Sequence, residues 1–260
     1  MSDAPLTAGE MTLVEHLAEL RDRLVRAVLA LVVGALLGYA VFDQVLGFLI
    51  APYCTLDTAF RNAAGDCALV ATRPLEPFSF RIKTSLVIGL FVAGPVIFYQ
   101  LWRFITPGLT DTERRYALPF VVLSQVMFVL GGSFGFFVIP QGLNVLLNIA
   151  GDQVNPLLSA GEYTSFLLTM IVAFGLTFEV PLVLVFLALL GVVTAPALRT
   201  ARPYAIVGAA ILAALVTPTT DPVTMLLLMA PLTLFYEASI VAAWWIGRRR
   251  AKREREAAAA

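Results

Sequence analysis

The sequence has few charged residues, one histidine and two cysteines. Charged side chains make up 14% of its 260 residues, against roughly 25% in ordinary globular chains. The 18 basic and 18 acidic residues cancel, so no basic surplus indicates a nucleic-acid partner. The histidine and cysteines are too few for a metal cage of these residues or for a dense disulfide framework. We therefore expect no bound metal and no cofactor.

Two motifs of common enzyme chemistry are missing as well. The sequence has no G-x-x-x-x-G-K-[ST] loop for nucleotide phosphates and no H-E-x-x-H pair for zinc. Its only histidine, His16, lies in a charged N-terminal segment and not beside a nucleophile, which argues against Ser-His or Cys-His chemistry. The sequence thus predicts a protein that is not an enzyme.

Apolar residues dominate the chain, with 59% hydrophobic residues and a mean hydropathy of +0.86. A bilayer core of roughly 30 Å needs about 20 apolar residues of helix. Six segments reach or approach this length: 25–45, 84–101, 116–140, 165–193, 204–216 and 223–246. The fifth is short, about 20 Å of helix. We predict an all-α membrane protein, with one six-span domain over residues 1–246 and a basic tail over 247–260.

The basic residues at the ends of these spans indicate their orientation. Fourteen Lys and Arg residues flank the spans on the side of the two termini, and four lie on the other side. Because cytoplasmic loops carry the excess of Lys and Arg, both termini should be cytoplasmic. The chain should cross the membrane several times.

Prolines and glycines indicate how the spans pack. Prolines bend membrane helices, and kinked helices favour a concave wall over a straight bundle; they fall inside or near the ends of spans at Pro95, Pro119, Pro181 and Pro231. Small residues let helices approach closely, and they form faces at Gly34 and Gly38 and at Gly131, Gly132 and Gly135. These faces either pack helices within this chain or accept a separate membrane helix.

The longest external loop, about residues 46–81, contains both cysteines, Cys54 and Cys67. Disulfides form in oxidising compartments, so this location favours a disulfide between them. The alternative is that both are small apolar residues packed under the loop. Short interfacial helices are expected in the same loop.

Two acidic residues within or near the spans need a partner. Glu179 lies at the middle of the fourth span, where a carboxylate costs roughly 2.5–3.5 kcal/mol or more. It either binds a polar group from another chain or is protonated and hydrogen-bonded to a neighbouring helix. Asp221 follows Thr217 at the outer turn before the sixth span, where it could simply cap that helix.

Two charged patches lie on the cytoplasmic side. The first, from Glu15 to Arg23, precedes the first span, and the second, residues 110–116, lies between the second and third spans. Carboxylates on such a surface can bind a planar guanidinium bidentately, in a way that lysine cannot match. Taken alone, both patches could equally be solvated interface charges.

Six motifs in order resemble the TatC family, the multispanning receptor subunits of the twin-arginine protein translocase. These are His16-Leu-Ala-Glu19-Leu-Arg21-Asp-Arg23-Leu24, residues 95–109 (PVIFYQLWRFITPGL), Glu113-Arg-Arg115, residues 174–181 (FGLTFEVP), Arg202-Pro-Tyr204, and Thr217-Pro218 before Asp221. The sequence departs from the family pattern at two points. One extra residue precedes Asp221, and Met225 stands where the family often has Gln.

The resemblance implies a receptor that binds twin-arginine signal peptides of folded proteins and uses the proton-motive force for export. It implies partners resembling the single-span TatA and TatB subunits, and further copies of the chain itself. The implied signal-peptide site contains Glu19 and Glu113, with Phe104 beside them. Arg21 and Arg115 would either orient the two carboxylates or contact the peptide backbone. The implied partner site within the membrane contains Glu179, Thr217 and Asp221.

Two other classes of membrane protein are alternatives to this interpretation. A secondary transporter for a small solute would account for Glu179, but it should show inverted repeats with paired broken helices. No matching halves are visible in the sequence. An intramembrane enzyme would need a nucleophile or a metal set at mid-depth, and Glu179 stands alone there.

Overall fold

A computed structural model describes residues 13–54, 67–105, 117–148, 159–216 and 222–259. These ranges are helical apart from short connections and one isolated parallel bridge between Val70 and Ser159. The helices are α1 (Leu13–Ala40), α2 (Phe42–Cys54), α3 (Glu76–Ile105), α5 (Ala117–Asn148), α6 (Ala160–Leu189), α7 (Ala195–Thr200), α8 (Arg202–Val216) and α9 (Pro222–Ala259). Five are long and apolar enough to cross a membrane, namely α1, α3, α5, α6 and α9. The all-helical, membrane-spanning class is therefore confirmed.

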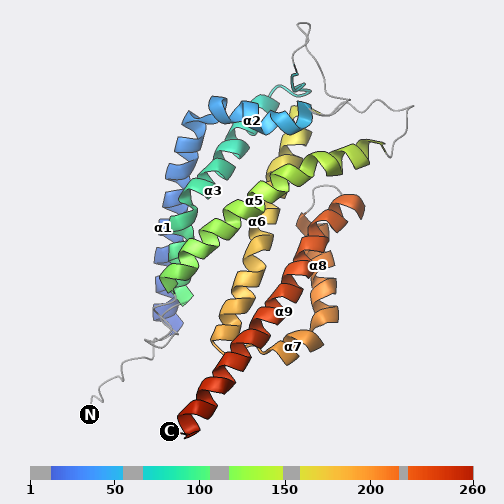
Figure 1. Cartoon of the computed structure of the whole chain (residues 1–260). Coiled ribbons are helices and arrows are strands. Elements are labelled where there is room, and N and C mark those ends of the chain that lie inside the picture. Colours follow the sequence, from blue (N-terminus) through green and yellow to red (C-terminus); the bar gives the residue numbers. More distant parts are fainter. Residues whose placement is uncertain (1–12, 55–66, 106–116, 149–158, 217–221, 260) are drawn as a thin grey trace, which may run out of the picture.

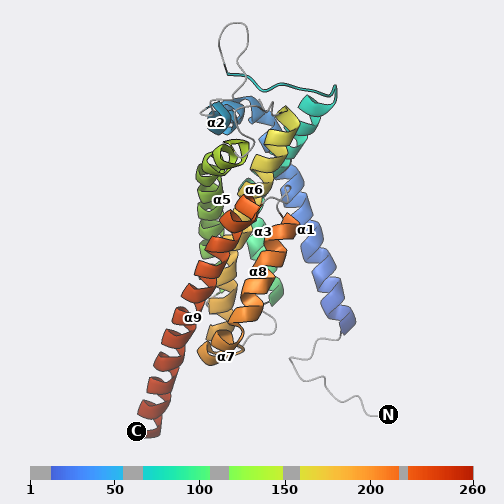
Figure 2. The ribbon, with the colours of Figure 1, turned by 90° about the vertical axis from the view of Figure 1, so that its right-hand side faces the viewer.

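Helix α6 stands in the middle of the molecule and contacts α3, α5 and α9 (Figure 1). On one side α1 packs along α3, and on the other side α8 packs against α9. Helix α2 lies across the upper end of the molecule as drawn in Figure 1. The start of α1 and the end of α9 both lie at the opposite, lower end (Figure 2). We call these the upper end and the lower end of the molecule.

Small residues bring the helices into close contact within this chain. A Cβ added to Gly89 of α3 would lie 2.4 Å from the backbone nitrogen of Ala35 in α1. A Cβ added to Gly131 of α5 would lie 2.5 Å from the carbonyl oxygen of Phe174 in α6. Both distances are far below van der Waals contact, so only glycine fits. The glycine faces on α1 and α5 therefore serve packing inside the subunit.

The upper half of α6 begins with a strong cap and is deeply buried. The Ser159 hydroxyl accepts a hydrogen bond from the Glu162 backbone at 3.2 Å, and the Glu162 carboxylate accepts one from the Ser159 backbone at 3.5 Å. This reciprocal capping box satisfies two free N–H groups at the helix start. The Tyr163 side chain donates to the Leu49 carbonyl at 2.9 Å and so ties α6 to α2. Helix α6 is thereby fixed as the central support.

The buried Glu76 carboxylate joins the starts of α3 and α6. It accepts hydrogen bonds from the backbone of Thr72 at 2.6 Å and of Arg73 at 3.1 Å. Its other oxygen accepts one from the backbone of Gly161, at the first turn of α6. These bonds tie the chain just before α3 to the first turn of α6. Helix α3 itself begins at Glu76, before the start of the predicted span 84–101.

The first predicted span, 25–45, does not coincide with a single helix. Helix α1 starts at Leu13, because the charged segment before the span is itself helical, and it ends at Ala40. The apolar run continues beyond this point, but it forms the separate helix α2, whose Phe42 and Leu49 side chains are buried at the upper end. Apolar length alone does not show such a turn. Pro52 lies inside α2.

The later spans also differ from their predicted bounds. Helix α6 runs over Ala160–Leu189 and not 165–193, because Gly191, with φ of +78°, turns the chain after it. Helix α5 continues to Asn148, past the predicted end of the third span. Helix α8 has 15 residues, close to the short fifth span expected. Helix α9 does not stop at residue 246 but continues to Ala259 through the basic segment.

Candidate functional site

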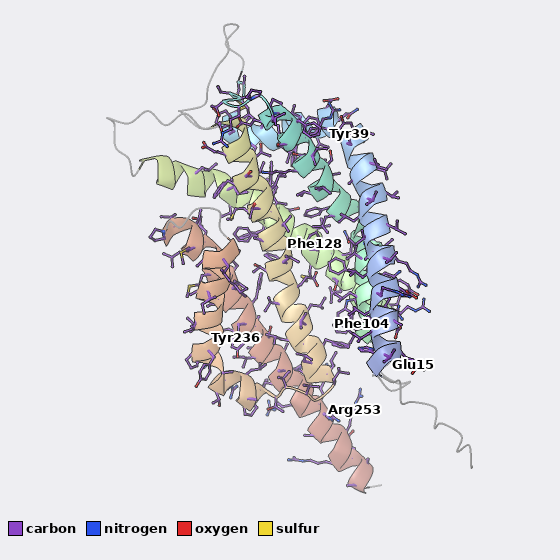
Figure 3. The ribbon with its side chains drawn as sticks, turned by 180° about the vertical axis from the view of Figure 1, so that it is seen from behind. Glu15, Tyr39, Phe104, Phe128, Tyr236 and Arg253 are labelled. Carbon is purple, nitrogen blue, oxygen red and sulfur yellow. A yellow bond between two sulfur atoms is a disulfide. The ribbon has the colours of Figure 1, made fainter. Side chains whose placement is uncertain are left out.

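The start of α1 and the end of α3 meet at the lower end of the molecule. Figure 3 shows Phe104 of α3 close to the first turns of α1, where Glu15 lies. The His16 ring stacks on the Phe104 ring, with centroids 4.5 Å apart and planes 19° apart. Stacked aromatic rings at this distance contribute about 0.5–1.5 kcal/mol beyond the area they bury. This contact fixes the N-terminal helix against α3 and holds Phe104 beside the first turns of α1.

Glu19 lies one turn beyond His16 and pairs with Arg23 on the same helix. The Arg23 Nε atom donates to Glu19 Oε1 at 2.9 Å, and a second guanidinium nitrogen contacts the same oxygen. The Glu19 side chain is 19% exposed and that of Arg23 is 11% exposed. The residues are four apart with the acid first, which is the favourable order for an ion pair on a helix. The pair therefore holds the Glu19 carboxylate in one orientation.

Each member of this pair keeps a buried polar atom without a partner. Glu19 Oε2 and Arg23 Nη1 are buried, and neither makes a hydrogen bond in the part of the chain that the structure describes. Gln100 Oε1 on α3 is also buried without a hydrogen-bond partner among the described residues. Gln100 lies one turn before Phe104 and on the same face of α3. A buried polar atom without a partner costs about 1–3 kcal/mol, so a ligand that supplies hydrogen bonds would be stabilised here.

Arg21 pairs with Asp22 and not with Glu19. Its side chain is 74% exposed and lies 2.9 Å from the Asp22 carboxylate. In this structure Arg23 orients Glu19, and a contact of Arg21 with the peptide backbone stays a prediction. The spacing of four residues between Glu19 and Arg23 is visible in the sequence and could have identified the pair. Glu113 and Arg115, the other predicted members, lie outside the described residues.

The Glu179 carboxyl group lies between α6 and α5. Its polar neighbour is Ser124 of α5, whose hydroxyl also accepts a hydrogen bond from the buried Trp102 indole of α3 at 3.1 Å. Glu179 Oε1 is buried and has no hydrogen-bond partner among the described residues. Glu179 is therefore linked to three helices and keeps one oxygen free for a further donor. Thr217 and Asp221 fall outside the described ranges.

A groove of about 560 Å³ runs along the face of α6 next to Glu179. Residues on both sides of Glu179, Thr177 and Val180, line it, and Glu179 itself does not. Its upper end contains Lys83 of α3, which donates to the Ser165 hydroxyl at 2.9 Å. The remaining walls come from α8 and α9, through Leu212, Leu228 and Leu232. The groove is thus mostly apolar, with hydroxyl groups along one helix.

The two cysteines are joined at the upper end. Cys54, the last residue of α2, forms a disulfide with Cys67, and their Cα atoms are 5.8 Å apart. This distance lies within the usual range for disulfides. Among the described residues no three His, Cys, Asp or Glu side chains gather in a way that could hold a metal ion.

Comparisons with known proteins agree on one family. Residues 15–231 match the family model described as Sec-independent protein translocase protein (TatC). The TatC protein of Frankia casuarinae is 40% identical over 250 residues, covering 94% of this chain and 69% of its own length. That of Desulforapulum autotrophicum is 39% identical, covering 94% of this chain and 88% of its own length.

A solved structure resembles the chain in both fold and sequence. The crystal structure of the twin arginine translocase receptor TatC in DDM superposes with a TM-score of 0.78 and 37% sequence identity. The superposition covers 88% of this chain and 99% of that one.

Proposed function

Since the chain belongs to the TatC family of Sec-independent protein translocase proteins, we propose that it is the receptor that binds twin-arginine signal peptides at its lower end. The family assignment makes it a multipass membrane protein of protein transport and not an enzyme. The proposal concerns the ligand, the residues that bind it and the partners.

The observation that carries the proposal is the state of the Glu19 carboxylate. Arg23 holds one oxygen, and the other is buried without a partner in the described structure. An arginine of the signal peptide would supply a charged, planar set of donors to that oxygen. Phe104, held by His16, would form the apolar wall beside the bound peptide. Gln100 would accept a further hydrogen bond from it.

We assign the second carboxylate to Glu113 and its orienting cation to Arg115. Helix α3 ends at Ile105 and α5 begins at Ala117, both at the lower end (Figure 1). The segment that carries Glu113 joins these two ends. This connectivity supports a shared surface of Glu19 and Glu113, one carboxylate for each arginine. Arg21, exposed and paired with Asp22, is left to contact the peptide from the rim.

The proposed topology has six spans, with α8 as the short fifth span and both termini in the cytoplasm. The excess of Lys and Arg on the lower side supports this orientation. Residues 1–246 would form the membrane domain, and 247–260 a basic extension of α9 at the cytoplasmic surface. Pro95, Pro181 and Pro231 lie inside α3, α6 and α9, which supports kinked helices and a concave wall. The protein would reside in the cytoplasmic membrane of a prokaryote.

The proposed partners are single-span proteins resembling TatA and TatB, together with further copies of this chain. Glu179 would meet a polar group from a partner helix, and Thr217 and Asp221 would extend that site toward the start of α9. The free oxygen of Glu179 and the adjacent groove support this assignment. Export of folded cargo would draw on the proton-motive force.

Co-purification of the membrane-embedded protein with a signal peptide tests the proposed ligand. The peptide carries either the Arg-Arg pair or Lys-Lys, and the protein is wild type, Glu19→Ala or Asp22→Ala. Asp22 is the matched control, an exposed carboxylate on the same helix. We expect Glu19→Ala to weaken binding of the Arg-Arg peptide by roughly 1.5–3 kcal/mol, the range for hydrogen bonds to charged groups. Equal binding of both peptides to the wild type would contradict the proposal.

A further inference from the structure

The lower part of α9 and the end of α6 form a second groove, away from the signal-peptide site. Its volume is about 410 Å³. It is lined by Phe186, Leu189 and Leu190 of α6 and by Trp245, Ile246, Arg249, Arg250 and Arg253 of α9. The groove therefore combines an apolar floor with three guanidinium groups. We propose that it binds the phosphate group of an anionic phospholipid.

Two arginines of this groove, Arg249 and Arg253, carry positive charge that no described carboxylate neutralises. Arg249 lies over the Trp245 ring, with its guanidinium carbon 3.3 Å from the ring centroid. Arg253 follows one turn later on the same face of α9. No carboxylate in the described ranges pairs with Arg249 or Arg253, whereas Lys252 on the same helix pairs with Glu256 at 3.7 Å. A phosphate would meet two guanidinium groups that pair with no carboxylate among the described residues.

The helical form of the basic segment builds the groove. Because α9 continues to Ala259, residues 245, 249 and 253 share one face instead of lying on a loose tail. Gly191, with φ of +78°, turns the chain after α6 and leaves room for Arg250. A Cβ at Gly191 would lie 2.6 Å from an Arg250 guanidinium nitrogen. The two helices are therefore in close contact at the rim of the groove.

The position of the groove favours a lipid over a free anion. Trp244 and Trp245 mark the end of the apolar part of α9, and tryptophan is typical of the membrane interface. Figure 3 places Arg253 at the lower end, below the packed helices. A free phosphate would use only the arginines. A phospholipid would also cover Phe186, Leu189 and Leu190 with its glycerol and upper acyl chain.

Native mass spectrometry of the detergent-purified full chain tests the proposal. The protein is titrated with dioctanoyl phosphatidylglycerol, with dioctanoyl phosphatidylcholine and with soluble glycerol phosphate. The groove variant is Arg249→Gln/Arg253→Gln. The control, Arg248→Gln/Arg255→Gln, removes the same charge from the same helix but from residues that do not line the groove. Circular dichroism of each variant verifies that the helices are intact.

We expect the wild type to prefer phosphatidylglycerol to phosphatidylcholine and to ignore glycerol phosphate. The groove variant should lose about 25-fold in affinity for phosphatidylglycerol, since each basic residue contributes about fivefold at an anionic surface. The control should retain the wild-type affinity. Equal losses in both variants would mean that diffuse tail charge attracts the lipid. Tight binding of glycerol phosphate would mean a free-anion site; either result overturns the proposal.

Discussion

Arg23 holds one oxygen of the Glu19 carboxylate, and the other oxygen is buried without a hydrogen-bond partner in the described structure. The ion pair and the vacant acceptor are thus parts of one arrangement. Arg23 limits the rotation of the carboxylate, and the second oxygen is kept at the lower end of α1 for an incoming donor.

Replacing Arg23 should therefore weaken signal-peptide binding although Arg23 need not touch the peptide. In Arg23→Ala the carboxylate is free to rotate and lies partly buried beside no cation, so we expect a loss of about 1–2 kcal/mol in binding. Arg23→Lys keeps the charge and should recover part of the lost binding free energy. Peptide affinity measured for both variants checks this. A direct contact with the peptide backbone would instead make Arg23→Lys as weak as Arg23→Ala.

The contact between α1 and α3 gives a prediction on stability. Gly89→Ala places a Cβ 2.4 Å from the backbone nitrogen of Ala35, and over-packing of this kind costs about 1–3 kcal/mol. Gly47→Ala in α2 is the control, because a Cβ there meets nothing within 4 Å. It should leave stability unchanged or raise it by up to about 1 kcal/mol. Thermal unfolding in detergent compares the two; equal midpoints would mean that α1 and α3 separate easily.

The disulfide at the end of α2 should be present in protein purified without reductant. Cys54 and Cys67 enclose a segment with a sequence separation of 13, and closing a loop of about this size stabilises a protein by roughly 3 kcal/mol in the chain-entropy model. We expect Cys54→Ser/Cys67→Ser to lose stability of that order. Non-reducing mass spectrometry gives the direct answer, and two alkylatable thiols in the purified protein would rule the bond out.

Glu179→Ala should fold with normal helix content but assemble poorly with its single-span partners. Hydrogen bonds between membrane helices contribute about 0.6–2 kcal/mol, so we expect partner affinity to fall by roughly 3- to 30-fold. Glu179→Gln keeps a hydrogen-bonding group beside Ser124 and is the matched control. Complex size on native gels and export of a reporter cargo measure the effect. Wild-type size and export in Glu179→Ala would reduce Glu179 to a structural residue.

The sequence predicts the helical class and much of the candidate site because these depend on local patterns. Apolar length identifies the spans, and motif order identifies Glu19 and Phe104. The stacking of His16 on Phe104 was not predictable, since it depends on α1 and α3 packing side by side over residues far apart in the chain. The ion pair of Glu19 with Arg23 could have been predicted from their spacing of four residues on one helix. The family motif instead suggests Arg21 as the residue that orients Glu19.

Other differences arise from long-range contacts of the same kind. The apolar run continues through Val41, so the sequence shows no sign of the turn there. Helix α2 lies across the upper end because Tyr163 of α6 forms a hydrogen bond with it. The bonds from Gly161 to Glu76 likewise join segments 85 positions apart. The charge of the segment after residue 246 indicates a basic tail. Its Ala, Arg, Lys and Glu residues also favour helix, and the segment continues α9 to Ala259.

The central claim is that Glu19 and Glu113 together read the arginine pair of the signal peptide. Site-specific crosslinking of an Arg-Arg signal peptide to Glu19→Ala/Glu113→Ala, beside wild type and each single variant, tests it most directly, with the Lys-Lys peptide as the reference for arginine-independent contact. We predict that the arginine-dependent crosslinks disappear in the double variant. The two single losses in binding should not add, since both carboxylates engage one peptide. Undiminished, arginine-dependent crosslinks in the double variant would mean that the arginines are read elsewhere.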